Sequence, residues 1–275
     1  MTGPRHSSVR SADPNDAVPA SRKTEVSSVR KALELLGCFT PRAAAWGLSD
    51  LARSLKIPKS TAHNLLRTLQ SFDFVRQDRE TRVYRLGPRA LELGLVFARG
   101  SDVLAHARTM MNRLAERTRE TVKVGILSSG QVLVVAAIES THQLHTRGDA
   151  GTRWPLHTSS LGKAILSNLP PEEAEEILSS KGMPRSTGNT LTTWRDMERE
   201  IRLIRARGYS LDQEESEPGV CCVAAPVTDV LHGVVAAISI SGPAVRLQGD
   251  TIEKFAKQVV VASRAIARHS VHENL

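Results

Sequence analysis

The 275-residue sequence contains few cysteines and no long apolar segment. Its longest apolar runs, Val132–Ile138 and Gly233–Ile240, are far shorter than the ~20 residues that a membrane-spanning helix needs. The opening residues, MTGPRHSSVRSADPND, have no apolar core of the kind found in a secretory signal. Three cysteines, Cys38, Cys221 and Cys222, are too few for a disulfide framework. These absences predict a cytoplasmic protein that does not associate with a membrane.

The sequence also lacks the motifs of common enzymes. Neither GxxxxGK[ST] nor GxGxxG occurs, so nucleotide chemistry has no support. Cys221 or Cys222 could pair with His157 as a nucleophile and base, but no spacing specifies the pair and no orienting third group is evident. We therefore predict that the protein is not an enzyme and needs no cofactor. His142 and His145 with His157 form a weak zinc pattern, and the sequence leaves open whether they bind a metal.

The formal net charge of +8 is concentrated in one segment of the chain. Residues 22–100 hold 15 basic and 7 acidic side chains, whereas residues 101–275 hold 20 of each and residues 1–21 hold two of each. This asymmetry favours a polyanion-binding module joined to a neutral module. Chance clustering of surface charge is the alternative.

The pattern of apolar residues divides the chain into four parts. Residues 1–21 have no hydrophobic periodicity, which predicts a disordered tail. Residues 22–87 combine three helical stripes with two short β-type runs around a polar turn, which predicts a winged helix-turn-helix domain. Residues 88–100 read as a linker helix. In residues 101–275, hairpin pairs flanked by helices predict an α+β domain with an antiparallel sheet, similar to a GAF domain.

The individual elements follow from the same pattern. Ser49 is a suitable N-cap for the second helix, and Pro58 suits the first position of the third. The expected helices cover residues 26–40, 49–55, 58–71, 89–98, 102–119, 158–169, 194–207 and 250–268, with a further helix starting at Pro170–Pro171. The expected strands cover residues 74–77, 83–86, 122–127, 132–139, 209–213, 220–228 and 234–241.

The third helix has an apolar side and a polar side. Ala62, Leu65, Leu66 and Leu69 lie together, while the opposite side carries hydrogen-bonding groups and no acid. Asn can read adenine and Arg can read guanine, whereas Ser, Thr and Lys more often hold phosphates. The candidate DNA-binding residues of this helix are Lys59, Ser60, Thr61, His63, Asn64 and Arg67, and those of the wing are Arg76, Arg79, Arg82 and Arg85. A solvated helix face beside a charged hairpin is the alternative interpretation.

These residues resemble a known family. From Ser27 to Gly94 the chain is similar to the DNA-binding domain of the IclR family of bacterial transcriptional regulators. The most specific segments there are LARSLKIPKSTA at 51–62 and YRLG at 84–87. The likeness continues through LGKA at 161–164, RGY at 207–209, GVCCVAAPV at 219–227 and SISGP at 239–243.

The second module contains a candidate ligand site. Taken alone, the backbone N–H groups of Ser160 and Leu161 could hold a carboxylate at a helix start, although the residues by themselves favour an ordinary Ser/Thr helix cap. The family resemblance implies a pocket for a small organic acid formed by Ser160, Leu161, Asp212, Cys222, Ser239 and Ser241. Relatives often carry smaller residues at the positions of Ser160 and Leu161, so the pocket volume and the identity of the ligand stay open.

Together these features predict a transcriptional regulator, with repression as the expected sign, whose affinity for double-stranded operator DNA is controlled by a small organic acid. The linker helix is expected to pack against a second copy, giving a homodimer that reads a palindromic operator. The resemblance implies that two dimers can associate into a homotetramer. Two alternatives remain at this point: an activator of a catabolic operon, and a small-molecule-binding protein or enzyme whose basic segment is incidental.

Overall fold

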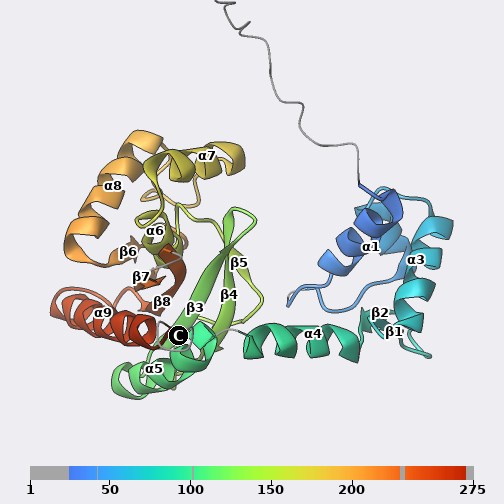
Figure 1. Ribbon diagram of the computed structural model, residues 1–275, viewed down its shortest axis with the longest axis horizontal. Coiled ribbons are helices and arrows are strands. Elements are labelled where there is room, and N and C mark those ends of the chain that lie inside the picture. The colour runs from blue at the N-terminus through green and yellow to red at the C-terminus, as the bar shows by residue number, and fades with distance from the viewer. Residues whose placement is uncertain (1–24, 42, 101, 230–232, 271–275) are drawn as a thin grey trace, which may run out of the picture.

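A computed structural model describes residues 25–41, 43–100, 102–229 and 233–270. The predicted tail, residues 1–21, lies outside this part of the chain. Figure 1 shows two folded modules connected by the single helix α4 (Pro88–Arg99). The first module holds three helices and a hairpin, and the second holds a sheet with helices on both faces. The fold class predicted from the sequence is confirmed.

The first module is a winged helix-turn-helix. Its helices are α1 (Ser27–Gly37), α2 (Leu48–Ser54) and α3 (Lys59–Ser71). They pack because each has apolar residues at helical spacing, and these residues meet in one small core. That core consists of Leu35, Leu51, Leu66, Leu69, Val75 and Tyr84. Burying these side chains fixes α3 with its polar side facing outward.

The wing consists of β1 (Val75–Gln77) and β2 (Tyr84–Leu86), which pair antiparallel. Trp46 extends this pair, since its backbone exchanges hydrogen bonds of 3.0 and 2.7 Å with Tyr84. Gly87 closes the wing at a close approach of two backbones, where a Cβ atom would lie 2.0 Å from the Asp73 carbonyl oxygen. Only glycine fits there, so this residue determines how the wing leads into α4.

The sheet of the second module is antiparallel throughout, with the order β5-β4-β3-β8-β7-β6. Its strands are β3 (Thr121–Ser128), β4 (Gln131–Ile138), β5 (Arg153–Trp154), β6 (Ser210–Gln213), β7 (Val220–Asp229) and β8 (Gly233–Pro243). The central strands β3 and β8 bring residues 121–125 beside residues 237–241.

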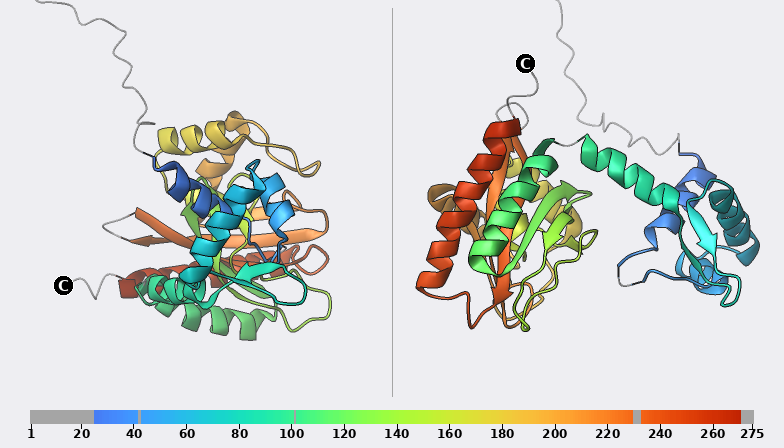
Figure 2. Two further views of the ribbon diagram at one scale, coloured as in Figure 1. Left: turned by 90° about the vertical axis from the view of Figure 1, so that its right-hand side faces the viewer. Right: turned by 90° about the horizontal axis from the view of Figure 1, so that it is seen from below.

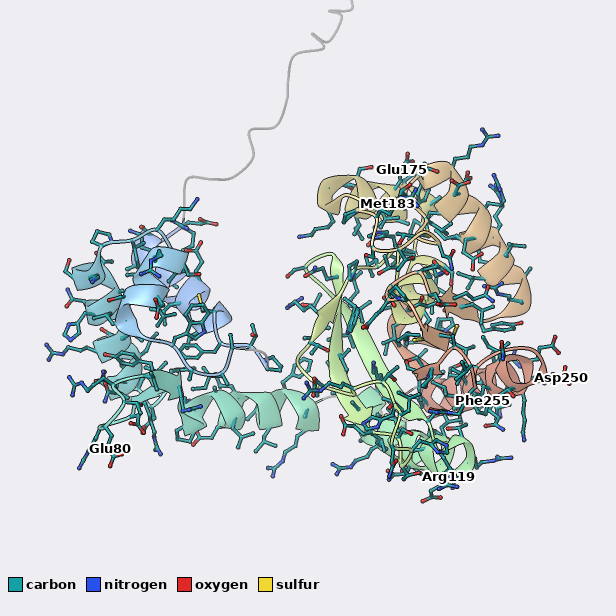
Figure 3. The ribbon with its side chains drawn as sticks, turned by 180° about the vertical axis from the view of Figure 1, so that it is seen from behind. Glu80, Arg119, Glu175, Met183, Asp250 and Phe255 are labelled. Carbon is teal, nitrogen blue, oxygen red and sulfur yellow. The ribbon has the colours of Figure 1, made fainter. Side chains whose placement is uncertain are left out.

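Helices cover both faces of this sheet. The helices α5 (Asp102–Thr118) and α9 (Asp250–Ser270) lie side by side on one face (Figure 2), and Phe255 of α9 (Figure 3) belongs to the core beneath them. The other face carries α6 (Ser160–Leu166), α7 (Pro171–Lys181) and α8 (Trp194–Arg207). Among the described residues, no helix is long and apolar enough to cross a membrane.

Several predicted boundaries were wrong. The helix expected over 158–169 is only α6, because Ser159 caps it by accepting a hydrogen bond from the Gly162 N–H, and the chain leaves the helix at Ser167. Ser49 lies inside α2, whose N-cap is Gly47, and Pro58 is the N-cap of α3 rather than its first residue. The first helix ends at Gly37, and the two-residue strand β5 was not expected.

Candidate functional site

The outward side of α3 presents the polar residues expected there. Lys59, Ser60, His63, Asn64 and Arg67 are exposed. Thr61 is partly buried, while Ala62 and Leu66 on the opposite side are completely buried. Within the described part of the chain, no carboxylate lies within salt-bridge distance of Arg67. This side of α3 is therefore a surface of hydrogen-bond donors and positive charge that is available to an anionic partner.

The wing adds arginines next to α3. Arg76, Arg79, Arg82 and Arg85 are all exposed. Among the described residues only Arg76 of these four is within salt-bridge distance of an acid, with its Nη2 atom 3.5 Å from Asp73 Oδ1. Asp78 organises the turn of the wing. Its Oδ1 atom accepts hydrogen bonds from the Thr81 N–H (2.7 Å), the Thr81 hydroxyl (2.8 Å) and the Glu80 N–H (3.1 Å). These bonds, those from Thr81 first, lower the pKa of the Asp78 carboxyl and keep it ionised as a turn-forming acceptor. Figure 3 shows Glu80 of this turn at the end of the molecule away from the second module.

The second module contains a cavity of about 310 Å³ on the face of the sheet that α6 covers. The structure brings all six predicted ligand residues to it: Ser160, Leu161, Asp212, Cys222, Ser239 and Ser241. They come from three strands and one helix far apart in the sequence. Gly162 makes this possible. A Cβ atom at this position would lie 2.4 Å from the Leu156 backbone, so any other residue would keep α6 farther from the segment around Leu156.

The sheet register explains why the cavity side chains converge. One row across the strands contains Asp212, Cys222, Ser241 and Thr121, each directly opposite the next. The adjacent row, two residues along each strand, contains Ser210, Ala224, Ser239 and Lys123. Because side chains two residues apart lie on the same face of a sheet, both rows face α6. The cavity is the space between these rows, α6 and residues 145–154.

Asp212 is buried at the β6 end of the cavity, with 1% of its surface exposed. Its Oδ1 atom accepts hydrogen bonds from the N–H groups of Glu215 (2.8 Å) and Ser216 (3.2 Å), and its Oδ2 atom accepts one from the Ser216 hydroxyl (2.5 Å). Burial raises the pKa of Asp212 despite these bonds. Asp212 therefore fixes the turn after β6 and presents a carboxyl group to the cavity wall.

Sequence reasoning missed the two cations that line the cavity, Lys123 and Arg147. The Nζ atom of Lys123 lies 5.8 Å from the centre of the Trp154 ring, within the range of a cation–π interaction. Arg147 is exposed, and its Nε atom lies 3.7 Å from Asp149 Oδ2. The available signal for Lys123 was its charge, since it is the one charged residue in the strand sequence TVKVGILS. Arg147 belongs to a loop without periodicity, and no pattern in the sequence pointed to it.

In the part of the chain that the structure describes, the cysteines and histidines do not come together as a reactive or metal-binding group. Burial raises the pKa of the Cys222 thiol to about 12, so it lines the cavity as a neutral group. The Nε2 atom of His157 hydrogen-bonds the Pro184 carbonyl at 3.0 Å, and the Nδ1 atom of His145 bonds the carbonyl of His142 at 2.8 Å. Within the described residues, no group of three or more His, Cys, Asp or Glu side chains is placed to hold a metal ion.

Comparisons with known proteins agree with both modules. The family described as "IclR helix-turn-helix domain" matches residues 28–79, and the family "Bacterial transcriptional regulator IclR C-terminal" matches residues 97–268. The chain is 33% identical over 242 residues to the HTH-type transcriptional regulator BhcR of Paracoccus denitrificans (strain Pd 1222), covering 88% of this chain and 86% of that protein. It is 32% identical over 244 residues to the transcriptional repressor IclR of Escherichia coli (strain K12), covering 88% and 89%.

Solved structures show the same architecture. An IclR transcriptional regulator from Alicyclobacillus acidocaldarius is similar with a TM-score of 0.81 at 25% identity, covering 90% of this chain and 100% of that one. An IclR homologue from Microbacterium hydrocarbonoxydans, solved in complex with 4-hydroxybenzoate, is similar with a TM-score of 0.78 at 26% identity, covering 88% and 98%.

A winged helix-turn-helix joined to a domain with a ligand-sized cavity defines the class of ligand-responsive transcriptional regulators. Within that class, the chain belongs to the IclR family, as the sequence motifs predicted. It is a transcriptional regulator and not an enzyme.

Proposed function

We propose that this regulator is a repressor whose affinity for operator DNA is controlled by a small organic acid in the cavity of the second module. The observation that carries the proposal is the union, in one chain, of an acid-free polar side on α3 and a cavity lined by Asp212, Ser239 and Ser241. The relative crystallised with 4-hydroxybenzoate supports a carboxylic acid as the ligand class. A role in operator binding also implies that the protein works in the cytoplasm.

The DNA-contacting residues follow from the geometry of the helix-turn-helix motif. In this motif the second helix of the pair enters the major groove with its leading residues at the base edges. In this chain that helix is α3, so Asn64 and Arg67 are assigned to base contacts, and Lys59, Ser60 and Thr61 to phosphates. The wing arginines Arg79 and Arg82 contact the backbone or the minor groove beside it.

The apolar surface of α4 supports a homodimer. None of its residues is buried, and Leu91 (66% exposed), Val96 (69%) and Phe97 (56%) leave a large apolar area uncovered on a short helix. Exposed apolar patches of this kind mark protein–protein contacts. Pairing of two α4 helices would place two α3 helices about a twofold axis, which matches a palindromic operator. Pairing of two such dimers gives the tetramer that the family resemblance implies.

Ligand control requires that the acid bind one arrangement of the paired DNA-binding modules better than the other. Only this difference in ligand affinity changes operator binding. A coupling free energy of ~1–3 kcal/mol shifts the affinity for the operator about 5- to 150-fold. The route between the modules is α4, which leads directly into α5 on the sheet.

Binding of the full chain to its own promoter region tests the proposal. We expect salt-dependent binding that is lost when residues 1–98 are removed, and release of the DNA by an organic acid from a panel of aliphatic and aromatic acids. Tighter operator binding with the acid, together with increased transcription, would instead identify an activator. Absence of DNA binding at low salt would mean that the basic segment is incidental.

A further inference from the structure

The geometry points to Lys123 as the residue that selects an anionic ligand, with the carboxylate of the acid held at the β3 end of the cavity. This inference rests on the proposed function and specifies how the cavity recognises its ligand. It assigns a role to a side chain that none of the sequence motifs singled out.

Lys123 is a cation of the cavity wall that has no anionic partner among the described residues. Its side chain is only partly exposed, no described carboxylate lies within salt-bridge distance of its Nζ atom, and that atom lies over the Trp154 ring. A partly buried ammonium is unfavourable unless it is paired and hydrogen-bonded. Arg147 differs, since it is largely exposed and has Asp149 beside it. Lys123 is therefore the lining cation that is available to a ligand.

Ser239 provides an independent observation at the same place. It lies directly opposite Lys123 in the pairing of β3 with β8, and its side chain faces the cavity. Ser239 is 1% exposed, and its Oγ atom has no hydrogen-bond partner among the described residues. Native proteins leave few buried hydroxyls unpaired, and each needs an explanation. A ligand oxygen between Ser239 and Lys123 supplies the missing partner to both.

The other end of the cavity has the opposite character. Asp212 lies on β6, separated from β3 by β8 and β7, so the strands that carry Lys123 and Asp212 lie about 14 Å apart across the sheet at the usual strand spacing. Cys222 lies between these ends, and both Lys123 and Asp212 influence its thiol. The cavity is thus polarised, with a cation at the β3 end and acid oxygens at the β6 end. A ligand that matches it has a carboxylate at one end and a hydrogen-bond donor at the other.

Leu161 of α6 lines the space between these ends, whereas Trp154 of β5 bounds the cavity on the side of Lys123 away from Asp212. The Trp154 ring lies next to the Lys123 ammonium and closes that side of the cavity. An apolar ligand body would pack against Leu161 while its carboxylate reaches Lys123. The chemical class that fits is therefore a hydroxylated acid with an apolar body.

Matched acid and amide probes test the role of Lys123, because an amide keeps the shape of an acid and removes its charge. The full-length protein is first screened against the panel of acids by thermal shift, and the best acid is then compared with its amide by calorimetry. We expect the wild type to prefer the acid at least about tenfold, the range expected for a charge-assisted hydrogen bond. The Lys123→Met variant should no longer prefer the acid. Its affinity for the acid should fall, while its affinity for the amide should stay within about threefold of the wild-type value.

Two further variants make the test specific. Lys254→Met removes an exposed lysine on α9, on the opposite face of the sheet, and should keep the wild-type preference. Lys123→Gln repeats the test with a polar side chain if Lys123→Met does not fold. Equal binding of acid and amide by the wild type, or an unchanged preference in the Lys123 variants, would overturn this inference and leave the proposed function intact. If no acid binds the wild type, the proposed acid effector is overturned, and the role of Lys123 with it.

Discussion

Lys163 and Glu215 form an ion pair in the interior of the second module. The Nζ atom of Lys163 lies 2.5 Å from both carboxylate oxygens of Glu215, and the two side chains are 1% and 10% exposed. The Glu215 N–H in turn donates to Asp212 Oδ1 at 2.8 Å. The pair therefore connects α6 to the turn after β6. Through that turn it positions the Asp212 carboxyl group, which lines the cavity.

Removing one member of this pair should destabilise the module strongly. Lys163→Met leaves the Glu215 carboxylate buried without a partner, which typically costs about 3–5 kcal/mol of unfolding free energy. Adding Glu215→Leu should recover much of that loss, because the second change removes the unpaired charge. Urea denaturation followed by circular dichroism measures both effects.

The exposed pair of Arg202 and Glu198 on α8 is the matched control. Its side chains are 61% and 43% exposed, so Arg202→Met should change the stability by no more than about 0.5 kcal/mol. A loss for Lys163→Met as small as that of the control would show that the buried pair contributes little.

Arg67→Ala should weaken specific operator binding by roughly 1–3 kcal/mol and relax the base preference at one position, because Arg67 lies on the outward side of α3. Binding titrations at fixed salt with single-base operator variants measure both effects. Gln70→Ala, an exposed change near the end of the same helix, is the control and should bind like the wild type. Unchanged affinity in Arg67→Ala would remove this residue from base recognition.

Arg82→Ala should lower the affinity for all DNA sequences alike. It should also make the dependence of log affinity on log salt concentration shallower, by the contribution of about one phosphate contact. Arg82 is exposed in the wing turn. Its carbonyl oxygen accepts a hydrogen bond from Gln77 Nε2 and its N–H donates to the Asp78 carbonyl, and the substitution keeps both backbone groups. Arg195→Ala makes the same charge change on α8 and should leave the slope unaltered. A loss restricted to one base pair would make Arg82 a base reader instead.

The sequence predicted those parts of the structure that depend on local patterns. The apolar spacing of Ala62, Leu66 and Leu69 predicted both the helix and its outward polar side, because burial of one stripe leaves the other exposed. Gly208 was expected at the end of a long helix, and it follows α8 in the left-handed conformation at φ 82°. The family motifs located the six predicted cavity residues.

Features that depend on pairing between distant parts of the chain could not be predicted from the sequence. Lys123 becomes a cavity residue only because β3 pairs with β8, which places it opposite Ser239, more than one hundred residues away. The Lys163–Glu215 pair likewise joins positions 52 residues apart. The helix at 158–169 was predicted too long because the apolar pattern continues past Leu166, although the backbone turns there. Periodicity describes one element at a time and carries no information on which elements meet.

Asp212→Ala should leave operator affinity unchanged and weaken the response to the acid, because Asp212 is far from α3 and fixes the wall of the cavity. The measurement is operator release as a function of acid concentration. The exposed Glu175 of α7 (Figure 3) provides the control, and Glu175→Ala should respond like the wild type. A fully responsive Asp212→Ala would remove Asp212 from the ligand site.

His157 should make the stability of the protein sensitive to acid. It is 1% exposed, and burial lowers its pKa below the usual value of 6.5, with the nearby charge of Lys163 acting in the same direction. Between the folded and the unfolded pKa the unfolded chain binds more protons, so the contribution of His157 is present above pH 6.5 and is lost as the pH falls through the folded pKa.

His157→Gln should therefore flatten the fall in melting temperature on acidification below about pH 6.5, since glutamine can donate to the Pro184 carbonyl and does not titrate. The raised pKa values of Asp212 and Glu215 make stability change with pH in the opposite direction. This contribution is the same in the wild type and in His157→Gln, so it cancels in the difference between their profiles. His63→Gln, an exposed change on α3, should keep the wild-type profile. If His157→Gln and the wild type lose stability in parallel, another group causes the acid sensitivity.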